Sequence, residues 1–171
     1  GTLRSEVAEA AMIAGAQIVN DISGGTLDPK MVDFITANQV PYIAMHMRGN
    51  PKNMQKMATY THIISEILFY FSQLIERLKD KGHSDLIIDP GFGFAKTTEQ
   101  NFEILSNLEL FKNLESIILV GLSRKSMIYK TLKTDASEAL NGTTVLNTLA
   151  LTKGADILRV HDVRPAVEAI K

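Results

Sequence analysis

Polar or charged side chains follow each of five short apolar runs in this 171-residue chain. After the successive runs come Asn20-Asp21, then His46 and Arg48, then Asp89, then Gly121 with Ser123-Arg124-Lys125-Ser126, and lastly Arg159 with His161-Asp162. If the runs are parallel strands, these residues lie on one side of the sheet, where ligands bind in barrels and in open sheets alike. Five strand ends that all carry donors, acceptors or charges therefore predict a binding site.

The first candidate for ligand recognition is Asp89, which directly follows the apolar run 86–88. A carboxylate in such a dry place must be paired or hydrogen-bonded. Because a carboxylate accepts two parallel hydrogen bonds, it would suit a planar ligand with adjacent N–H donors. The segment 91–94, Gly-Phe-Gly-Phe, would let the backbone approach a flat ring and would supply an aromatic wall. Asn20 adds both a donor and an acceptor.

A second group of residues predicts contact with an anion. Arg159 and His161 are spaced as an anion-binding pair. Ser123 stands at the start of a predicted helix, where a carboxylate is stabilised, and Lys125 could contact a ring carbonyl. The composite ligand is therefore flat, rich in N–H groups, and carries or meets an anion.

Several of the polar residues also have purely structural interpretations. Asp21 and Asp162 could be helix N-caps, and we favour that role for Asp162 because it precedes a helix pattern. His46 is as consistent with a buried, hydrogen-bonded histidine as with a ligand-binding one. Met45 and Met47 are more typical of packing than of ligand contact.

Strand and helix patterns alternate along the chain. We expect strands at 17–22, 41–47, 86–89, 116–121 and 156–160, and helices at 4–16, 29–38, 62–82, 97–108, 123–132, 135–155 and 162–171. This order predicts a parallel sheet built of right-handed βα units, and the almost wholly apolar strands indicate that both faces are covered. A doubly wound sheet and a (β/α)₈ barrel both fit. A Thr cap should begin the helix 97–108, and an Asp135/Glu138 capping box should begin the helix 135–155.

Composition narrows the class of protein. The net charge of −1 gives no overall field that would attract nucleic acid or an anionic membrane. The absence of cysteine excludes disulfides and thiolate metal sites and fits a reducing cytoplasm. The sequence has neither an apolar stretch long enough to span a bilayer nor a signal-peptide pattern at its start. We expect a cytoplasmic protein with one domain over 1–171.

Six stretches together resemble the dihydropteroate synthases of the pterin-binding family. They are GAQIVNDISGG (15–25), YIAMHMRGNPKNMQ (42–55), LIIDPGFGFAK (86–96), ILVGLSRKS (118–126), NGT (141–143) and GADILRVHDV (154–163). The resemblance implies a (β/α)₈ barrel, of which this chain would form five parallel strands with their helices. It also implies a folate-synthesis transferase that condenses 6-hydroxymethyl-7,8-dihydropterin diphosphate with 4-aminobenzoate, the family's sulfonamide target.

The resemblance assigns roles to residues of the predicted site. It implies a pterin pocket formed by Asn20, Ile22, Met45, Asp89, Phe94, Gly121 and Lys125. Arg159 and His161 would take the diphosphate, and Ser123 would lie near the aminobenzoate carboxylate. Lys125, Arg159 and His161 are therefore the expected catalytic groups. They would position the substrates and stabilise the charge on the leaving diphosphate, and no protein nucleophile is expected. The family uses Mg²⁺, but no residue here is expected to be its ligand.

The chain departs from the family pattern at its start. A barrel of this kind takes about 250 residues, and the family's first strand with its TPDSFSDGG-like loop, and its STRPG loop, do not occur here. Gly1 stands where the family has an Asp before Thr2. We therefore expect a barrel truncated at its N-terminus, inactive or nearly so alone. Open sheet edges at 17–22 and 156–160 predict self-association, as a homodimer or through those edges.

Two other functions remain as alternatives. A corrinoid-linked methyltetrahydrofolate methyltransferase of the same superfamily would share the Asn and Asp that read the pterin. It would not be expected to carry the Ser-Arg-Lys-Ser cluster or the Arg159 and His161 pair, because it binds no diphosphate. A non-catalytic pterin-binding module would be expected to lose Lys125 or Arg159, and both are present.

Overall fold

Five parallel strands form one sheet in the computed structural model, which describes residues 1–171 apart from the side chain of residue 55. The strands are β1 (Val19–Asp21), β2 (Tyr42–Met45), β3 (Leu86–Asp89), β4 (Ile117–Val120) and β5 (Ile157–Leu158). They lie side by side in chain order, so β1 and β5 are the two edges of the sheet. The predicted strands, their parallel pairing and the two predicted edges are confirmed.

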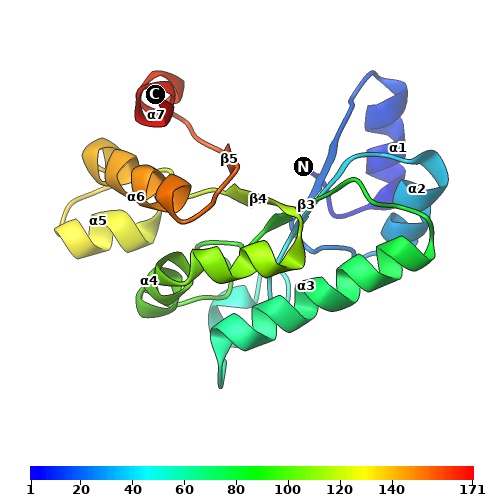
Figure 1. Ribbon diagram of the computed structural model, residues 1–171, viewed down its shortest axis with the longest axis horizontal. Helices are drawn as coiled ribbons and strands as arrows, with labels where there is room; N and C mark the ends of the chain where they lie inside the picture. Colours follow the sequence, from blue (N-terminus) through cyan, green and yellow to red (C-terminus); the bar gives the residue numbers. More distant parts are fainter.

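Helices follow the strands in the same order. The α-helices are α1 (Ser5–Ile13), α2 (Lys30–Asn38), α3 (Ile63–Asp80), α4 (Thr98–Ser106), α5 (Ser126–Leu132), α6 (Leu140–Thr152) and α7 (Val163–Ile170), and two 3₁₀ helices are η1 (Met54–Met57) and η2 (Leu108–Leu114). In Figure 1 the helices curve around the outside of the sheet, from α1 and α2 through α3 and α4 to α5, α6 and α7. This is the arrangement of a barrel arc, in which helices cover the outer face.

The core lies between the outer face of the sheet and these helices. The strands are short and apolar, and parallel register places Ala44 beside Ile88 and Ile88 beside Ile118, all of them buried. The long helix α3 presents one apolar stripe to them, including Ile67 and Phe71, which are fully buried. This packing holds the carboxyl ends of the strands in fixed positions, and the predicted site residues follow those ends.

Helix ends differ in part from the prediction. Thr97 caps α4, as expected, in a capping box with Gln100. The capping box predicted at Asp135 and Glu138 is wrong, because α6 begins at Leu140. The Asp135 carboxylate instead accepts hydrogen bonds from Ser137 and Glu138 in a turn upstream of that helix, since a short acidic side chain competes for local backbone N–H groups. Among the described residues, no helix combines the length and apolarity needed to cross a membrane.

Candidate active site

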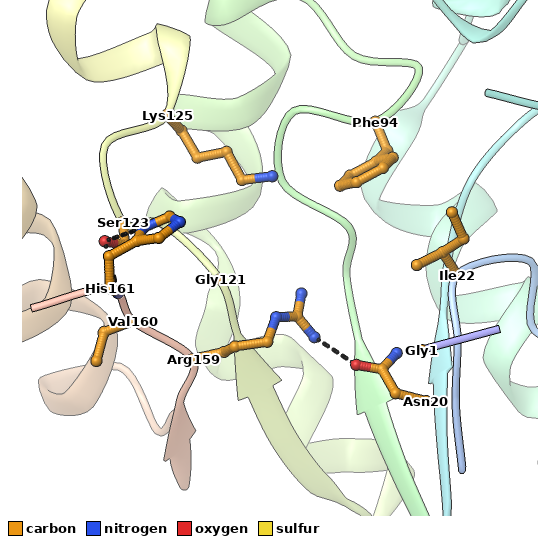
Figure 2. Close-up of a pocket in the computed structure, with 10 residues that line it drawn as sticks. All are labelled: Gly1, Asn20, Ile22, Phe94, Gly121, Ser123, Lys125, Arg159, Val160 and His161. Carbon is orange, nitrogen blue, oxygen red and sulfur yellow. Dashed lines mark hydrogen bonds between the residues drawn. The ribbon is translucent and has the colours of Figure 1, made fainter. Parts of the chain in front are cut away.

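A cleft of about 330 Å³ opens at the carboxyl ends of the strands. Figure 2 shows the ten residues that line it: Gly1, Asn20, Ile22, Phe94, Gly121, Ser123, Lys125, Arg159, Val160 and His161. Eight of these ten are predicted site residues, all except Gly1 and Val160. Residues from β1 to the loop after β5 therefore converge on one hollow, as the sequence analysis predicts.

The floor of the cleft is an ion pair between the buried Asp89 and the partly exposed Arg159. Asp89 is only 1% exposed, and its Oδ2 accepts a hydrogen bond from Arg159 Nη2 at 2.7 Å. Its Oδ1 accepts from the backbone N–H of Gly91 at 2.8 Å. Arg159 also donates through Nη1 to Asn20 Oδ1 at 3.1 Å, as Figure 2 shows. The arginine, itself partly exposed, therefore lies between the cleft and Asp89 and also contacts Asn20, which lines the cleft.

Asn20 leaves a donor for a ligand. Its Nδ2 is buried and has no hydrogen-bond partner within the described part of the chain. A buried amide donor without a partner costs free energy. Because Asn20 lines the cleft, a ligand acceptor placed there would satisfy this group.

The walls of the cleft combine an aromatic ring and a cation. Lys125 Nζ lies 4.4 Å from the centroid of the Phe94 ring, and Ile22 stands on the same side as Phe94 (Figure 2). Burial lowers the pKa of Lys125, and nearby Arg159 adds to this effect while Asp89 opposes it. Gly121 provides room, since a Cβ there would lie 2.9 Å from Arg159 Nη2. The cleft that these groups line suits a flat, polar-edged ligand.

Ser123 and His161 form a pair at the rim. The Ser123 hydroxyl lies 2.9 Å from His161 Nδ1, and it accepts from the His161 backbone N–H at 3.2 Å. The expected place of Ser123 at a helix start is wrong, because α5 begins three residues later, at Ser126. The loop after β4 and the loop after β5 meet at this contact.

Two predicted pocket residues lie behind the surface of the cleft. Asp89 is covered by Arg159, as described above. Met45 is fully buried, and it forms a small apolar cluster with Met47 and Ala95 against which Ile22 and Phe94 pack. Met45 thus supports the wall residues, and it could shape the pocket only through them.

The structure decides between the alternatives for His46 and for the two candidate caps. His46 is buried, and burial, with Lys96 and Arg48 nearby, lowers its pKa well below the usual value, so it is a neutral structural histidine. The Asp21 carboxylate accepts hydrogen bonds from Ser23 and Gly25 in the loop after β1 and from the Tyr42 hydroxyl on β2, and it caps no helix. Asp162 directly precedes α7, but the preferred capping role is wrong because its carboxylate binds Arg124.

Sequence reasoning missed Lys96. Its side chain is 5% exposed, and Nζ donates to the carbonyl oxygens of His46, Gly91 and Phe94 at 3.2, 3.0 and 2.9 Å. Nζ also lies 3.1 Å from His46 Nδ1. The ammonium group joins the end of β2 to the loop after β3, beneath the cleft. The signal in the sequence was the position of Lys96, which ends an apolar loop and lies seven residues after Asp89.

Gly91 is required by a close approach of two backbones. Its φ is +75°, and a Cβ there would lie 2.1 Å from the His46 carbonyl oxygen. Gly82 has a similar φ of +72°, but a Cβ there would meet open space among the described residues. At both positions the backbone conformation favours glycine. At Gly91 the close approach of the His46 carbonyl oxygen also leaves no space for a Cβ. This approach lets Gly91 donate to Asp89 while its carbonyl binds Lys96.

The cleft does not fit a magnesium site. No group of three or more His, Asp or Glu side chains is placed to hold a metal ion in the described residues. Mg²⁺ prefers oxygen ligands, but the Asp21 carboxylate accepts hydrogen bonds from Ser23, Gly25 and Tyr42. The carboxylates of Asp89 and Asp162 are bound to arginines. The residues present therefore assign no role to the metal.

Comparison with known proteins agrees with this geometry. Residues 1–161 match the family described as "Pterin binding enzyme". The dihydropteroate synthase of Synechocystis sp. is 43% identical, over 99% of this chain and 60% of that protein. Dihydropteroate synthase from Thermus thermophilus superposes with a TM-score of 0.93 in its complex with 6HMPPP and 0.94 in its complex with 4-aminobenzoate, each at 34% identity. These cover 99% of this chain and 68% and 66% of the solved chains. The five βα units are thus part of a (β/α)₈ barrel, as predicted, and the chain spans 60% of the length of that curated relative.

Proposed function

The chain belongs to the pterin-binding enzyme family, and on that premise we propose that its cleft serves dihydropteroate synthesis. The reaction joins 6-hydroxymethyl-7,8-dihydropterin diphosphate to 4-aminobenzoate and releases diphosphate. One observation carries the proposal: a buried carboxylate and an unpartnered buried amide nitrogen lie together at the floor of the cleft, where an arginine contacts both side chains. A pterin offers adjacent ring N–H and amino groups that match this floor.

Pterin binding must move Arg159. The N–H edge of the ring would need the Asp89 oxygen that Arg159 Nη2 now contacts at 2.7 Å. Displacement of the guanidinium would leave the carboxylate paired with the ring, so Asp89 would stay hydrogen-bonded throughout. Asn20 would supply its free amide N–H to a ring acceptor. The guanidinium would then be free to meet the charge that the substrate brings.

The walls would hold the ring in place. Ile22 and Phe94 would cover one face of the ring, with Met45 packed behind them. Because Gly121 has no side chain, it would leave room for the ring. Lys125 Nζ, which already faces this space in Figure 2, would donate to the ring carbonyl. Since one face and the edge of the ring would be contacted, these residues would define its orientation.

The remaining residues would serve the leaving group and the second substrate. Arg159, once released, and His161 would bind the diphosphate and stabilise the charge that develops as it departs. Ser123 would lie near the aminobenzoate carboxylate. The pterin ring would stabilise the exocyclic carbon as its C–O bond breaks and diphosphate leaves. The neutral amine would then form the C–N bond and release one proton to solvent. The protein positions the reactants and stabilises charge, and no step requires a protein nucleophile.

Assembly and location follow from the same proposal. We expect the chain to self-associate because β1 and β5 are the two edges of the sheet, and at the β1 edge only Thr2, among the described residues, pairs with the strand, through the Asn20 carbonyl. A cytoplasmic location fits its lack of cysteine. Light scattering should give a mass above the 18.9 kDa of one chain, and a monomer mass at high concentration would contradict self-association.

Titration with 6-hydroxymethylpterin diphosphate tests the proposed function. We expect saturable binding with one site per chain, weakened about tenfold in Lys125→Met because one charge-assisted hydrogen bond is lost. Lys130→Met is the matched control, since Lys130 is an exposed lysine of the same helix region and should leave binding unchanged. Isothermal titration calorimetry measures both. Equal affinity in the two variants would contradict the role of Lys125, and no binding by a folded wild-type chain would contradict the pterin site.

A further inference from the structure

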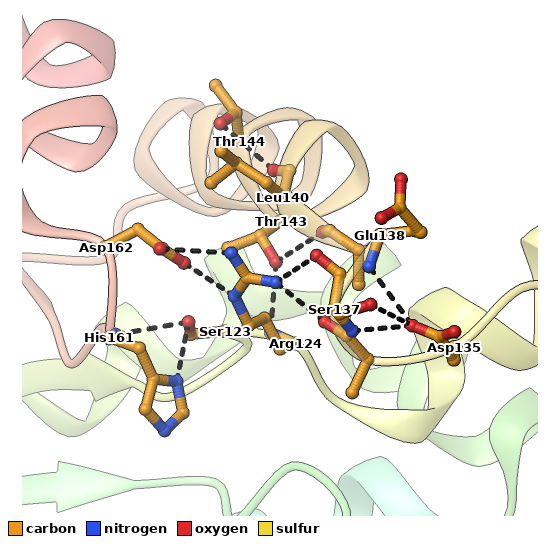
Figure 3. A network of polar contacts seen from close by, with 12 residues as sticks. Ser123, Arg124, Asp135, Ser137, Glu138, Leu140, Thr143, Thr144, His161 and Asp162 are labelled. Carbon is orange, nitrogen blue, oxygen red and sulfur yellow. Dashed lines mark hydrogen bonds and ion pairs between the residues drawn. The ribbon is translucent and has the colours of Figure 1, made fainter.

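Arg124 lies between two cleft residues in sequence but makes its contacts elsewhere. Ser123 and Lys125 line the cleft, whereas the Arg124 guanidinium binds Asp162, as Figure 3 shows. Its backbone has a φ of +52°, a conformation that non-glycine residues rarely adopt. Its backbone N–H donates to Thr143 Oγ1 at 3.0 Å. The side chain is thereby turned toward the loop after β5.

Each nitrogen atom of the Arg124 guanidinium donates a hydrogen bond. Nε and Nη2 donate to the two oxygens of Asp162 at 2.9 and 3.1 Å, which is a bidentate pair. Nη1 donates to the carbonyls of Ala136 and Ser137, at 2.8 Å for Ala136. Arg124 and Asp162 side chains are 24% and 25% exposed, so water screens the pair only in part. One residue thus joins the loop after β4, the turn before α6 and the loop after β5.

Apart from the Arg159 side chain, which binds Asp89 and Asn20, the loop after β5 has little other support from the sheet. β5 has two residues, and it pairs with β4 through Leu119 with Ile157 and Val120 with Leu158. It is also an edge strand. Asp162 immediately follows His161, and Arg124 immediately precedes Lys125. The bidentate pair therefore acts on the residues that flank the cleft.

From these contacts we propose that Arg124 and Asp162 are positioning residues for the reaction. Their ion pair fixes the distance between Lys125, which would hold the pterin, and Arg159 with His161, which would hold the diphosphate. The rim contact between Ser123 and His161 alone is a neutral hydrogen bond, weaker than a bidentate ionic one. The inference rests on the proposed function for the identity of the two ligand parts. The placement of the loops by the ion pair stands apart from it.

The test compares two ligands on Asp162→Asn. Asparagine keeps the size of the side chain and removes the charge that binds Arg124. Calorimetric titration with 6-hydroxymethylpterin and with its diphosphate gives the gain in affinity that the diphosphate supplies. We expect that gain to fall about tenfold in Asp162→Asn, the value of one charge-assisted hydrogen bond, while the affinity for 6-hydroxymethylpterin stays within about twofold.

Glu168→Gln is the matched control. It removes a carboxylate of α7 that pairs with Arg164 at 3.0 Å, but that pair is 91% and 63% exposed and lies away from the cleft residues. Exposed pairs of this kind contribute little, so both affinities should equal those of the wild type. An unchanged diphosphate gain in Asp162→Asn overturns the proposal, and so does an equal loss for both ligands with a lower melting temperature.

Hydrogen exchange separates this inference from the proposed function. We expect Asp162→Asn to accelerate amide exchange in peptides covering 121–126 and 157–163, and Glu168→Gln to leave both peptides unchanged. If the wild-type chain binds neither pterin, the proposed function is wrong, and exchange still decides the placement of the loops. Unchanged exchange in Asp162→Asn overturns the inference whatever the titrations give.

Discussion

Replacement of Asp89 by asparagine should lower the affinity for 6-hydroxymethylpterin diphosphate at least about a hundredfold. In the proposed complex, both oxygens of this 1% exposed carboxylate accept hydrogen bonds. Asparagine would turn an N–H group toward either the ring N–H edge or the Gly91 N–H. Sites built to hydrogen-bond a ligand reject a mismatched partner strongly, because buried polar groups are left unpaired. Calorimetric titration measures the loss directly.

Asp33→Asn provides the control for Asp89→Asn. Asp33 is an exposed residue that pairs with Lys81 on the surface, and its loss should leave the affinity unchanged. Circular dichroism should show that both variants are folded before titration. An Asp89→Asn chain that is folded and binds within about fivefold of the wild type would remove Asp89 from the site.

The second large effect is on stability, at Lys96. Lys96→Met should lower the free energy of unfolding by about 3 kcal/mol, because three carbonyl oxygens beneath the cleft lose their donor. Lys81→Met removes an exposed pair and should cost at most about 0.5 kcal/mol. Urea denaturation compares the two. A loss below about 1 kcal/mol in Lys96→Met would show that the loop is held by other contacts.

Lys96 also predicts the pH dependence of stability. Burial lowers its pKa to about 7, from 10.5 for an ordinary lysine. Between these values the unfolded chain binds the proton more tightly than the folded chain, so the free energy of unfolding rises with pH. Urea denaturation from about pH 7 to about pH 9 should therefore show a steeper rise in the wild type than in Lys96→Met. Parallel profiles would contradict the lowered pKa.

Much of the fold was predictable because its strands are short, apolar and each followed by a helix. All five strands are confirmed, and so is the Thr97 cap, because local hydrogen bonds there agree with the helix pattern. The start of α6 was not predictable from Asp135, because that carboxylate satisfies turn N–H groups instead. Sequence alone allowed helices on both faces of the sheet or on one. Tertiary packing decides this, and the structure places them along the outer face (Figure 1).

The site was predictable in its membership and less so in its internal contacts. Residues at strand ends must converge in a parallel sheet, and eight of them line one cleft. Which charged partner meets Asp89 could not be read from sequence, because Arg159 is 70 residues away and Lys125 and Lys96 are also close. The pairing of Arg124 with Asp162 was likewise hidden, since an aspartate before a helix usually caps it.

The most direct test of the pterin site is a crystal structure of this chain with 6-hydroxymethylpterin diphosphate. The proposed function predicts the ring against Phe94, with its carbonyl accepting from Lys125 Nζ and its N–H edge on the Asp89 carboxylate. It also predicts that the 2.7 Å contact between Arg159 Nη2 and Asp89 is broken and that the guanidinium faces the diphosphate. A ligand bound elsewhere, or a ring in the cleft with the Arg159–Asp89 contact intact, would contradict it.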